Sequence, residues 1–227
     1  MKQESRVIED TRVGAFIQSL DEGNKGFLME LEKRATDDRI PIIRPQVQNL
    51  LRVIIAAKSP KSILEVGTAV GFSSILMAEC SDENCGITTI ENYDKRIPVA
   101  RANIEKSGFG DRITLIEGDA AVVLKELRSE GLSYDLIFMD AAKGQYLNFY
   151  EDVMAMLNNG GMLISDNVLQ DGDIIQSRFA VTRRNRTIHS RMREYLYILT
   201  HDERLRTTIL PMGDGVTLSV RTGRIQK

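Results

Sequence analysis

Cysteine is scarce in this chain: Cys80 and Cys85 are the only two among 227 residues. Their spacing fits neither a zinc knuckle nor a redox pair, and it gives no disulfide framework. We therefore expect two free thiols, as in proteins of a reducing compartment.

A strong excess of charge and a long apolar run are also missing. The formal net charge of −2 argues against a protein coated in positive charge, although a local basic patch is compatible with it. No apolar stretch approaches the roughly 20 residues needed to cross a bilayer. The N-terminal sequence MKQESRVIED lacks the apolar core of a signal peptide. These absences predict a cytoplasmic protein without a membrane span.

The length and the hydrophobic content of 42% suffice for one domain with a sizeable core. No internal repeat or low-complexity linker divides the chain. Apolar residues recur at helical spacing within residues 5–35, and a further helix is expected from about Gln46 to Ala57. We therefore expect a helical extension over residues 1–45 that belongs to the same domain as residues 46–227.

Short β-rich runs alternate with helix-like stretches through most of the remaining chain. This alternation predicts βαβ units and a doubly wound, mostly parallel, Rossmann-like α/β sheet. The last two runs flank Gly213-Asp214-Gly215, a strong turn signal that predicts a C-terminal antiparallel hairpin. The expected strands are Ser62–Val66, Gly86–Ile90, Ile113–Glu117, Leu136–Met139, Gly161–Ile164, Thr207–Leu210 and Val216–Val220.

Three consecutive strand ends carry residues suited to a nucleotide-like cofactor. Gly67 and Gly71 after the first strand let the backbone turn tightly and approach a ligand. Glu91 at the tip of the second strand is placed to accept hydrogen bonds from a ribose diol. Asp119 and Ala120 follow the third strand, where an adenine would lie. Each feature alone could be an ordinary strand-to-helix turn, but the three in order predict a cofactor site.

The type of cofactor follows from Ala69 and Glu65. A dinucleotide fingerprint needs G-x-G-x-x-G so that the pyrophosphate meets the helix N-terminus, and here Ala69 stands within that turn. Glu65 would repel a pyrophosphate but would suit a ligand that carries an ammonium and a sulfonium group. We therefore predict S-adenosylmethionine rather than NAD.

The fourth strand ends in Asp140 and the fifth in Asp166-Asn167. Two carboxylates and an amide oxygen form an all-oxygen set suited to Mg²⁺ or another divalent cation. Lys143 follows Asp140 by three residues, and beside a metal it would lose its proton more readily and act as a base. The plainer alternatives are a helix cap or turn residue for each Asp and a solvated surface lysine for Lys143.

The motifs at these strand ends resemble those of the catechol and caffeoyl-CoA O-methyltransferase family. The similarity covers most of the chain, from about Ile40 to Val220. The motifs that carry it are Glu65-x-Gly67, Glu91, Asp140-x-x-Lys143 and Asp166-Asn167.

This resemblance implies a class I methyltransferase fold and a methyl transfer to a hydroxyl that depends on S-adenosylmethionine and Mg²⁺. It implies that Lys143 is the catalytic base, that Asp140 borders both the metal and the cofactor, and that the protein is a homodimer joined through its N-terminal helices. The metal ligands are then Asp140, Asp166 and Asn167. The cofactor-binding residues are then Ile43, Glu65, Gly67, Thr68, Gly71, Ser73, Glu91, Asp119, Ala120 and Asp140.

One departure from the catechol-type pattern concerns the two residues between Asp140 and Lys143. Catechol-type members have bulky residues there, whereas this chain has Ala141 and Ala142. The smaller side chains make the mouth of the site roomier, which argues against a small catechol as the acceptor.

The segment 178–206 contains eight arginines, both histidines and no lysine, and only three acidic residues oppose them. Its apolar positions share one helical face, so the arginines project from the other side. A solvated helix with surface ion pairs is the plainer interpretation. Arginine is nevertheless the side chain suited to phosphate forks and base stacking.

Together with Ala141-Ala142, the sequence RRNRTI at residues 183–188 resembles the bacterial tRNA 5-hydroxyuridine methyltransferases of the same fold family. This resemblance implies that the substrate is tRNA and that 5-hydroxyuridine in the anticodon loop becomes 5-methoxyuridine. The tRNA contacts that we then expect are Arg183, Arg184, Arg186 and Arg191.

Two other functions stay open at this point. The first is a small-molecule O-methyltransferase that acts on catechols, phenylpropanoid esters or a secondary metabolite. The second is a non-catalytic nucleotide- or RNA-binding module, against which the intact set of Asp140, Lys143, Asp166 and Asn167 argues.

Overall fold

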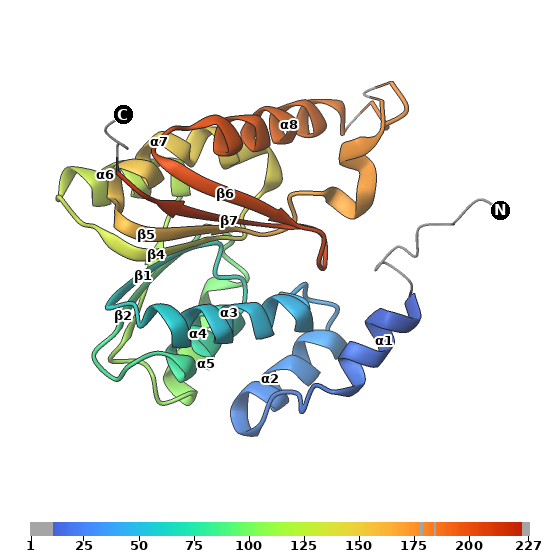
Figure 1. The fold of residues 1–227 in the computed structure, drawn as a ribbon. Coiled ribbons are helices and arrows are strands. Elements are labelled where there is room, and N and C mark those ends of the chain that lie inside the picture. The colour runs from blue at the N-terminus through green and yellow to red at the C-terminus, as the bar shows by residue number, and fades with distance from the viewer. Residues whose placement is uncertain (1–10, 178, 184, 224–227) are drawn as a thin grey trace.

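The computed structural model describes residues 11–177, 179–183 and 185–223 (Figure 1). The strands are β1 (Ser62–Val66), β2 (Gly86–Glu91), β3 (Ile113–Glu117), β4 (Tyr134–Met139), β5 (Leu157–Ser165), β6 (Leu205–Leu210) and β7 (Val216–Arg221). The helices are α1 (Thr11–Ser19), α2 (Gly26–Asp37), α3 (Pro45–Lys58), α4 (Phe72–Cys80), α5 (Ile97–Lys106), α6 (Ala120–Ser129), α7 (Tyr146–Met156) and α8 (Arg186–His201), with the 3₁₀ helices η1 (Lys143–Gln145) and η2 (Gln170–Ile175).

The strands form one seven-stranded sheet in the order β3-β2-β1-β4-β5-β7-β6. Strands β1 to β5 all run parallel to one another, whereas β7 pairs antiparallel with both β5 and β6. The predicted Rossmann-like fold with its C-terminal hairpin is therefore confirmed. The strand order reverses between β1 and β4, and open α/β sheets bind their ligands beyond the carboxyl ends of the strands at such a point.

The central strands are buried on both faces, which explains their near-continuous apolar sequences. In β4, Leu136 and Phe138 belong to the core that α2, α3 and α4 cover, while Ile137 and Met139 belong to the core under α6, α7 and α8. Figure 1 shows the two helical layers with the sheet between them. This packing fixes the strand ends and therefore fixes the residues that follow them.

The N-terminal extension contains two helices in its described part. Gly23 lies between α1 and α2, and Gly26 begins α2; their positive φ angles of 68° and 54° are ones that glycine adopts at little cost. Helix α2 buries Leu28 and Leu31 and packs near α4, whereas α1 leaves the apolar Phe16 63% exposed. Within the described ranges, no helix is both long enough and apolar enough to span a membrane.

Asp202 joins the end of α8 to α7 and β6. Its carboxylate accepts a hydrogen bond from the Oη of Tyr150 at 2.5 Å and from the guanidinium of Arg204 at 2.6–3.0 Å. The hydrogen bond from Arg204 contributes most to a pKa of Asp202 that is lowered to about 2. The Asp202 side chain is only 11% exposed, so this charge depends on its protein partners.

We expect Asp202→Asn to lower the free energy of unfolding by about 1–2 kcal/mol near neutral pH, because charged hydrogen bonds to a half-exposed arginine are lost. A lowered folded-state pKa stabilises the protein above the unfolded pKa of about 3.9, and this contribution disappears as the pH falls through the folded value of about 2. Urea unfolding should give a smaller difference in the free energy of unfolding between variant and wild type at about pH 3 than at about pH 7. An equal gap at both pH values would contradict this account, and Glu126→Gln on the exposed face of α6 is the control.

Candidate active site

A cavity of about 530 Å³ lies beyond the carboxyl ends of β1, β2, β3 and β4. Each of these strand ends contributes to the lining, with Gly67, Glu91, Asp119 and Asp140 among the residues. The volume falls in the range of small-molecule sites. The cavity therefore lies where the strand order predicts a ligand, and its lining is acidic.

Gly67 brings the turn after β1 against the end of β4. Its φ is 106°, and a Cβ on this residue would lie 2.2 Å from the carbonyl oxygen of Asp140. The amide of Asp140 donates to the carbonyl of Val66 at 3.0 Å. Only glycine allows this approach, so Gly67 fixes the backbone of Asp140 at the edge of the cavity.

The two acids expected to contact the ribose and the adenine are held by backbone amides. Glu91 accepts hydrogen bonds from the amide of Ala69 at 2.7 Å and from the amides of the two residues that follow it at 3.0 and 2.9 Å. Asp119 caps α6 and accepts from the amide of Ala121 at 2.8 Å. A carboxylate has further acceptor capacity, so both side chains are positioned before a ligand arrives.

Glu65 is fully buried at the end of β1, next to the cavity-lining Val66. Its Oε2 accepts hydrogen bonds from the hydroxyls of Ser74 and Thr89, whereas its Oε1 has no partner among the described residues. Burial raises the pKa of Glu65 above its ordinary value, although hydrogen bonds from Ser73, Ser74 and Thr89 oppose this effect. An unpaired buried oxygen is uncommon in native proteins, and a cationic ligand group would give it a partner.

Asp140 and Asp166 follow the neighbouring strands β4 and β5. Burial raises the pKa of Asp140 to about 7, and the charges of Asp166 and Glu65 add to the effect. Burial also raises the pKa of Asp166 to about 6, although the amide of Asn167 donates to its Oδ1 at 2.7 Å. Two desolvated carboxyl groups beside an amide are the oxygen donors that a hard divalent cation prefers, and such a cation would relieve their repulsion.

Asn167 has a positive φ of 58°, which is rare for residues other than glycine and tolerated best by Asn and Asp. Strained backbone of this kind is concentrated at functional sites. No group of three or more His, Cys, Asp or Glu that could hold a metal is found in the described ranges, and the expected set contains only two such residues. Mg²⁺ therefore stays a prediction that the chemistry of the donor set supports.

Lys143 begins η1, three residues after Asp140, and is half-buried. Its positive charge opposes the effect of burial and lowers the pKa of both Asp140 and Asp166. The lysine expected to act as a base therefore lies near both carboxyl groups expected to hold the metal.

Tyr146, the first residue of α7, connects the end of β4 to the residue that follows β5. It is completely buried, and its Oη donates to the carbonyl of Met139 at 3.1 Å and to the carbonyl of Asp166 at 3.0 Å. Because a phenol has a single proton, the two carbonyls share it. The shared hydrogen bond fixes the separation between the backbone of Asp166 and the residue that precedes Asp140.

Five expected cofactor residues are not part of the cavity lining. Ile43 packs in the core, Gly71 precedes α4, and the hydroxyl of Thr68 pairs with that of Thr89 at 2.6 Å. Their contact with a cofactor stays a prediction, and so does the binding of a metal by Asp166 and Asn167. The residues concerned are Ile43, Glu65, Thr68, Gly71 and Ser73.

Two of the arginines expected to contact tRNA donate hydrogen bonds to other residues of the protein. Arg186 donates to the carbonyls of Val181 and Phe179 at 3.3 and 3.5 Å, and Arg191 donates to the side chain of Asn148. Arg183 is exposed, and Arg184 lies outside the described residues. The arginines of this segment therefore do not project uniformly into solvent, as the helical spacing had suggested.

Sequence reasoning missed several residues around the site. Tyr93 and Arg96 line the cavity, with the guanidinium of Arg96 5.4 Å from the Tyr93 ring centroid. The Asp214 carboxylate raises the pKa of Asp166, and the Arg44 guanidinium, 2.5 Å from Asp214, lowers it. Tyr93 and Arg96 could have been found from the sequence, because they lie soon after Glu91 at the end of β2. No local signal brings Arg44 and Asp214 to Asp166, because they come from opposite ends of the chain.

Comparison with known proteins decides the family. The O-methyltransferase family model matches residues 18–222. Caffeoyl-CoA O-methyltransferase 2 of Petunia hybrida is 32% identical over 179 residues, which cover 75% of this chain and 72% of the petunia protein. The chain belongs to the S-adenosylmethionine-dependent O-methyltransferases of the caffeoyl-CoA and catechol type.

Solved structures agree with this membership. A Staphylococcus aureus protein provisionally assigned as a caffeoyl-CoA O-methyltransferase superposes with a TM-score of 0.84 at 28% identity, covering 91% of this chain and 98% of that one. The Podospora anserina methyltransferase PaMTH1, solved with S-adenosylhomocysteine bound, gives a TM-score of 0.81 at 28% identity and covers 93% and 94% of the two chains. This O-methyltransferase therefore shares both the fold and recognisable sequence with its relatives.

We expect Tyr146→Phe in this O-methyltransferase to reduce methyl transfer and raise the Mg²⁺ concentration needed for half-maximal activity, each by about tenfold, because residues that orient metal ligands have effects of this size. Affinity for S-adenosylmethionine, measured by titration calorimetry, should be unchanged. The matched control is Tyr150→Phe, which removes a phenol of the same helix that bonds Asp202 instead. Equal metal requirements in the two variants would show that the Tyr146 hydroxyl has only a structural role.

Proposed function

We propose that this O-methyltransferase methylates 5-hydroxyuridine at the wobble position of the tRNA anticodon loop and forms 5-methoxyuridine. The contact between α8 and η1 is the observation that carries the proposal. A Cβ on Gly144 would lie 3.6 Å from the Ile188 side chain, so the arginine-rich helix begins beside Lys143. Phosphates held along this helix would bring a base to the mouth of the site.

The shape of the mouth supports a nucleobase as the acceptor. Ala141 and Ala142 line the cavity immediately after Asp140 and leave room beside the carboxylate. The 5-hydroxyl and the 4-carbonyl of the base are neighbouring oxygens, as the two hydroxyls of a catechol are. A single-stranded loop can also splay its base into a pocket, which a paired stem cannot.

The residues of the site have distinct roles in this proposal. The cavity holds S-adenosylmethionine, whose positive sulfonium suits an acidic lining and which supplies the methyl group. Asp140, Asp166 and Asn167 would hold Mg²⁺, which would supply the Lewis acidity that favours an ionised hydroxyl. Lys143, in its unprotonated form, accepts the hydroxyl proton at Nζ. The hydrogen-bonded ends of β4 and β5 would position the acceptor hydroxyl beside Lys143 and the carboxylates.

Methylation of a small molecule is the second candidate, and the names of the relatives favour it. The petunia protein, 32% identical, is named for caffeoyl-CoA. The same carboxylates and lysine would serve a phenolic acceptor without change, so the residues around the mouth must distinguish the two. The homodimer and the cytoplasmic location expected from the sequence stay predictions.

We expect the purified protein with S-adenosylmethionine and Mg²⁺ to convert 5-hydroxyuridine to 5-methoxyuridine in tRNA, because base and backbone are both recognised. Mass spectrometry of the digested nucleosides measures the product. Catechol and caffeoyl-CoA, assayed in parallel, should be methylated far more slowly. Turnover of either small acceptor with no methoxyuridine would move the function to the second candidate.

Chelation of divalent cations with EDTA should abolish methyl transfer, and Mg²⁺ should restore it, because two desolvated carboxyl groups need the cation.

Lys143→Gln should lower kcat by about a hundredfold or more while leaving S-adenosylmethionine binding intact. Lys125→Gln, on the exposed face of α6, is the matched control and should retain full activity. Activity unaffected by EDTA would exclude the metal role, and a fully active Lys143→Gln would exclude the base.

A further inference from the structure

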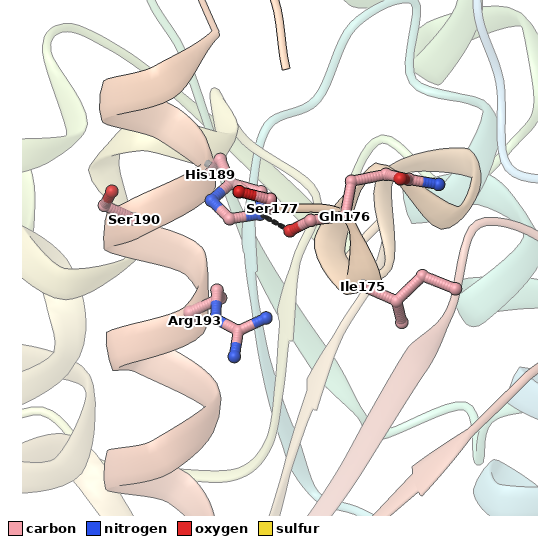
Figure 2. Close-up of a pocket in the computed structure, with 6 residues that line it drawn as sticks. All are labelled: Ile175, Gln176, Ser177, His189, Ser190 and Arg193. Atoms are coloured by element: carbon pink, nitrogen blue, oxygen red, sulfur yellow. Dashed lines mark hydrogen bonds between the residues drawn. The ribbon is translucent and has the colours of Figure 1, made fainter. Parts of the chain in front are cut away.

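A second cavity of about 530 Å³ opens between η2 and α8, and we call it the η2–α8 groove. Figure 2 shows His189 and Arg193 extending from α8 toward the segment that follows η2. The groove shares no lining residue with the cofactor cavity, so both can be occupied at once. The residues that line the groove are Ile175, Gln176, Ser177, His189, Ser190 and Arg193.

Arg193 gives the groove a positioned cation. Its Nη1 donates to the carbonyl of Ile174 at 2.8 Å, which uses one of the five N–H donors of a guanidinium. Arg193 is exposed and takes part in none of the salt bridges within the described ranges. The carboxylates nearest in sequence, Asp173 and Glu194, do not line the groove. The remaining donors of Arg193 are therefore available to an anion.

The walls of the groove are held by hydrogen bonds to the backbone. His189, 2% exposed, contacts the Gln176 carbonyl through Nε2 at 3.2 Å, and because a carbonyl only accepts, Nε2 carries the proton. Ser177 Oγ accepts a hydrogen bond from the Phe179 amide at 3.3 Å and keeps its own proton for a ligand. The two walls are thus fixed relative to each other before any ligand binds.

Two exposed apolar side chains border these polar groups. Ile175 is 79% exposed at the groove itself, and Phe179 is 81% exposed two residues after Ser177. The guanidinium of Arg186 lies 6.0 Å from the centroid of the Phe179 ring and donates to the Phe179 carbonyl. Arg186 therefore holds the backbone that presents Phe179 to solvent. An exposed aromatic ring on the same connection as a groove that holds a cation is a pattern of sites that bind single-stranded nucleic acid.

The groove lies next to the candidate active site. Helix η2 begins at Gln170, soon after Asn167, and α8 contacts η1 through the region of Ile188, which directly precedes His189. A further cation, Arg183, is exposed beyond the groove on the segment that connects η2 to α8. This continuation suits a polyanion that crosses the surface better than a single small nucleotide.

We propose that the η2–α8 groove binds a nucleotide that neighbours the target uridine in the RNA chain, with its phosphate on Arg193 and Ser177 and its base on Phe179. The proposal rests on the proposed function, since it assigns a subsite to the same RNA substrate. Arg186 is in this account a positioning residue for Phe179 rather than a phosphate ligand.

The test is binding of an unmodified anticodon stem-loop RNA, measured by fluorescence anisotropy over a series of salt concentrations. Arg193→Gln should weaken binding by about tenfold and reduce the slope of log K against log salt by about 1, because one phosphate contact is lost. Phe179→Ala should weaken binding by about tenfold with an unchanged slope, and Phe179→Trp should restore it, because stacking tolerates any aromatic ring. The matched control is Arg206→Gln, an exposed arginine of β6 beyond the far end of α8.

The outcomes separate this inference from the proposed function. Wild-type protein that binds and methylates the RNA, with Arg193→Gln and Phe179→Ala binding equally well, would overturn the groove and leave the function intact. Wild-type protein without RNA affinity would overturn both. A loss of caffeoyl-CoA affinity in Arg193→Gln without a loss of RNA affinity would assign the groove to the nucleotide end of a CoA ester instead. S-adenosylmethionine binding, unchanged in every variant, verifies that each is folded.

Discussion

The burial of two neighbouring carboxyl groups is the constraint on which the rest of this site depends. Asp140 and Asp166 both have raised pKa values, about 7 and about 6, because burial disfavours their charged forms. Their closeness follows from the sheet, in which Met139 and Ser165 are paired residues of β4 and β5. Packing and backbone hydrogen bonds must hold such a pair together, and a bound cation would convert the repulsion into affinity.

The helices on one face of the sheet maintain that pair and also carry the surface that faces a substrate. Tyr146 and Tyr195 meet edge to face at 5.4 Å between ring centroids, joining α7 to α8. The Tyr195 hydroxyl lies 2.6 Å from Ser165 Oγ, immediately before Asp166. The buried face of helix α8 is thus joined to β5, while Arg193 lies on the exposed side of the helix. A substrate bound along α8 would therefore have a fixed position relative to the carboxylates.

The sequence was informative wherever function depends on the ends of strands. Apolar runs and glycines predicted the parallel sheet, and the sheet places Gly67, Glu91 and Asp140 around one cavity without further information. Residues brought together by long-range packing could not be predicted in the same way. The Arg44–Asp214 pair acts on Asp166, yet Asp214 reads in the sequence only as part of a tight turn.

The arginine-rich segment marks a further limit of sequence reasoning. Helical spacing identifies the apolar face of α8 but does not distinguish among the arginines outside that face. In the structure, these arginines have different partners. Arg186 and Arg191 bond to the protein, and Arg193, which the sequence did not single out as an RNA contact, lines a groove. The choice of partner depends on where loop carbonyls fall, and that is decided by the path of the chain between η2 and α8.

In the proposed function, the chemistry and the acceptor are therefore encoded in different parts of the molecule. The methyl donor and the expected metal would depend on strand ends that the sheet positions, within the O-methyltransferase family match that spans residues 18–222. The acceptor depends on Ala141 and Ala142 at the mouth and on the connection from η2 to α8, which the sheet does not fix. Such connections can change without disturbing the buried carboxylates, because loops contribute little to the core.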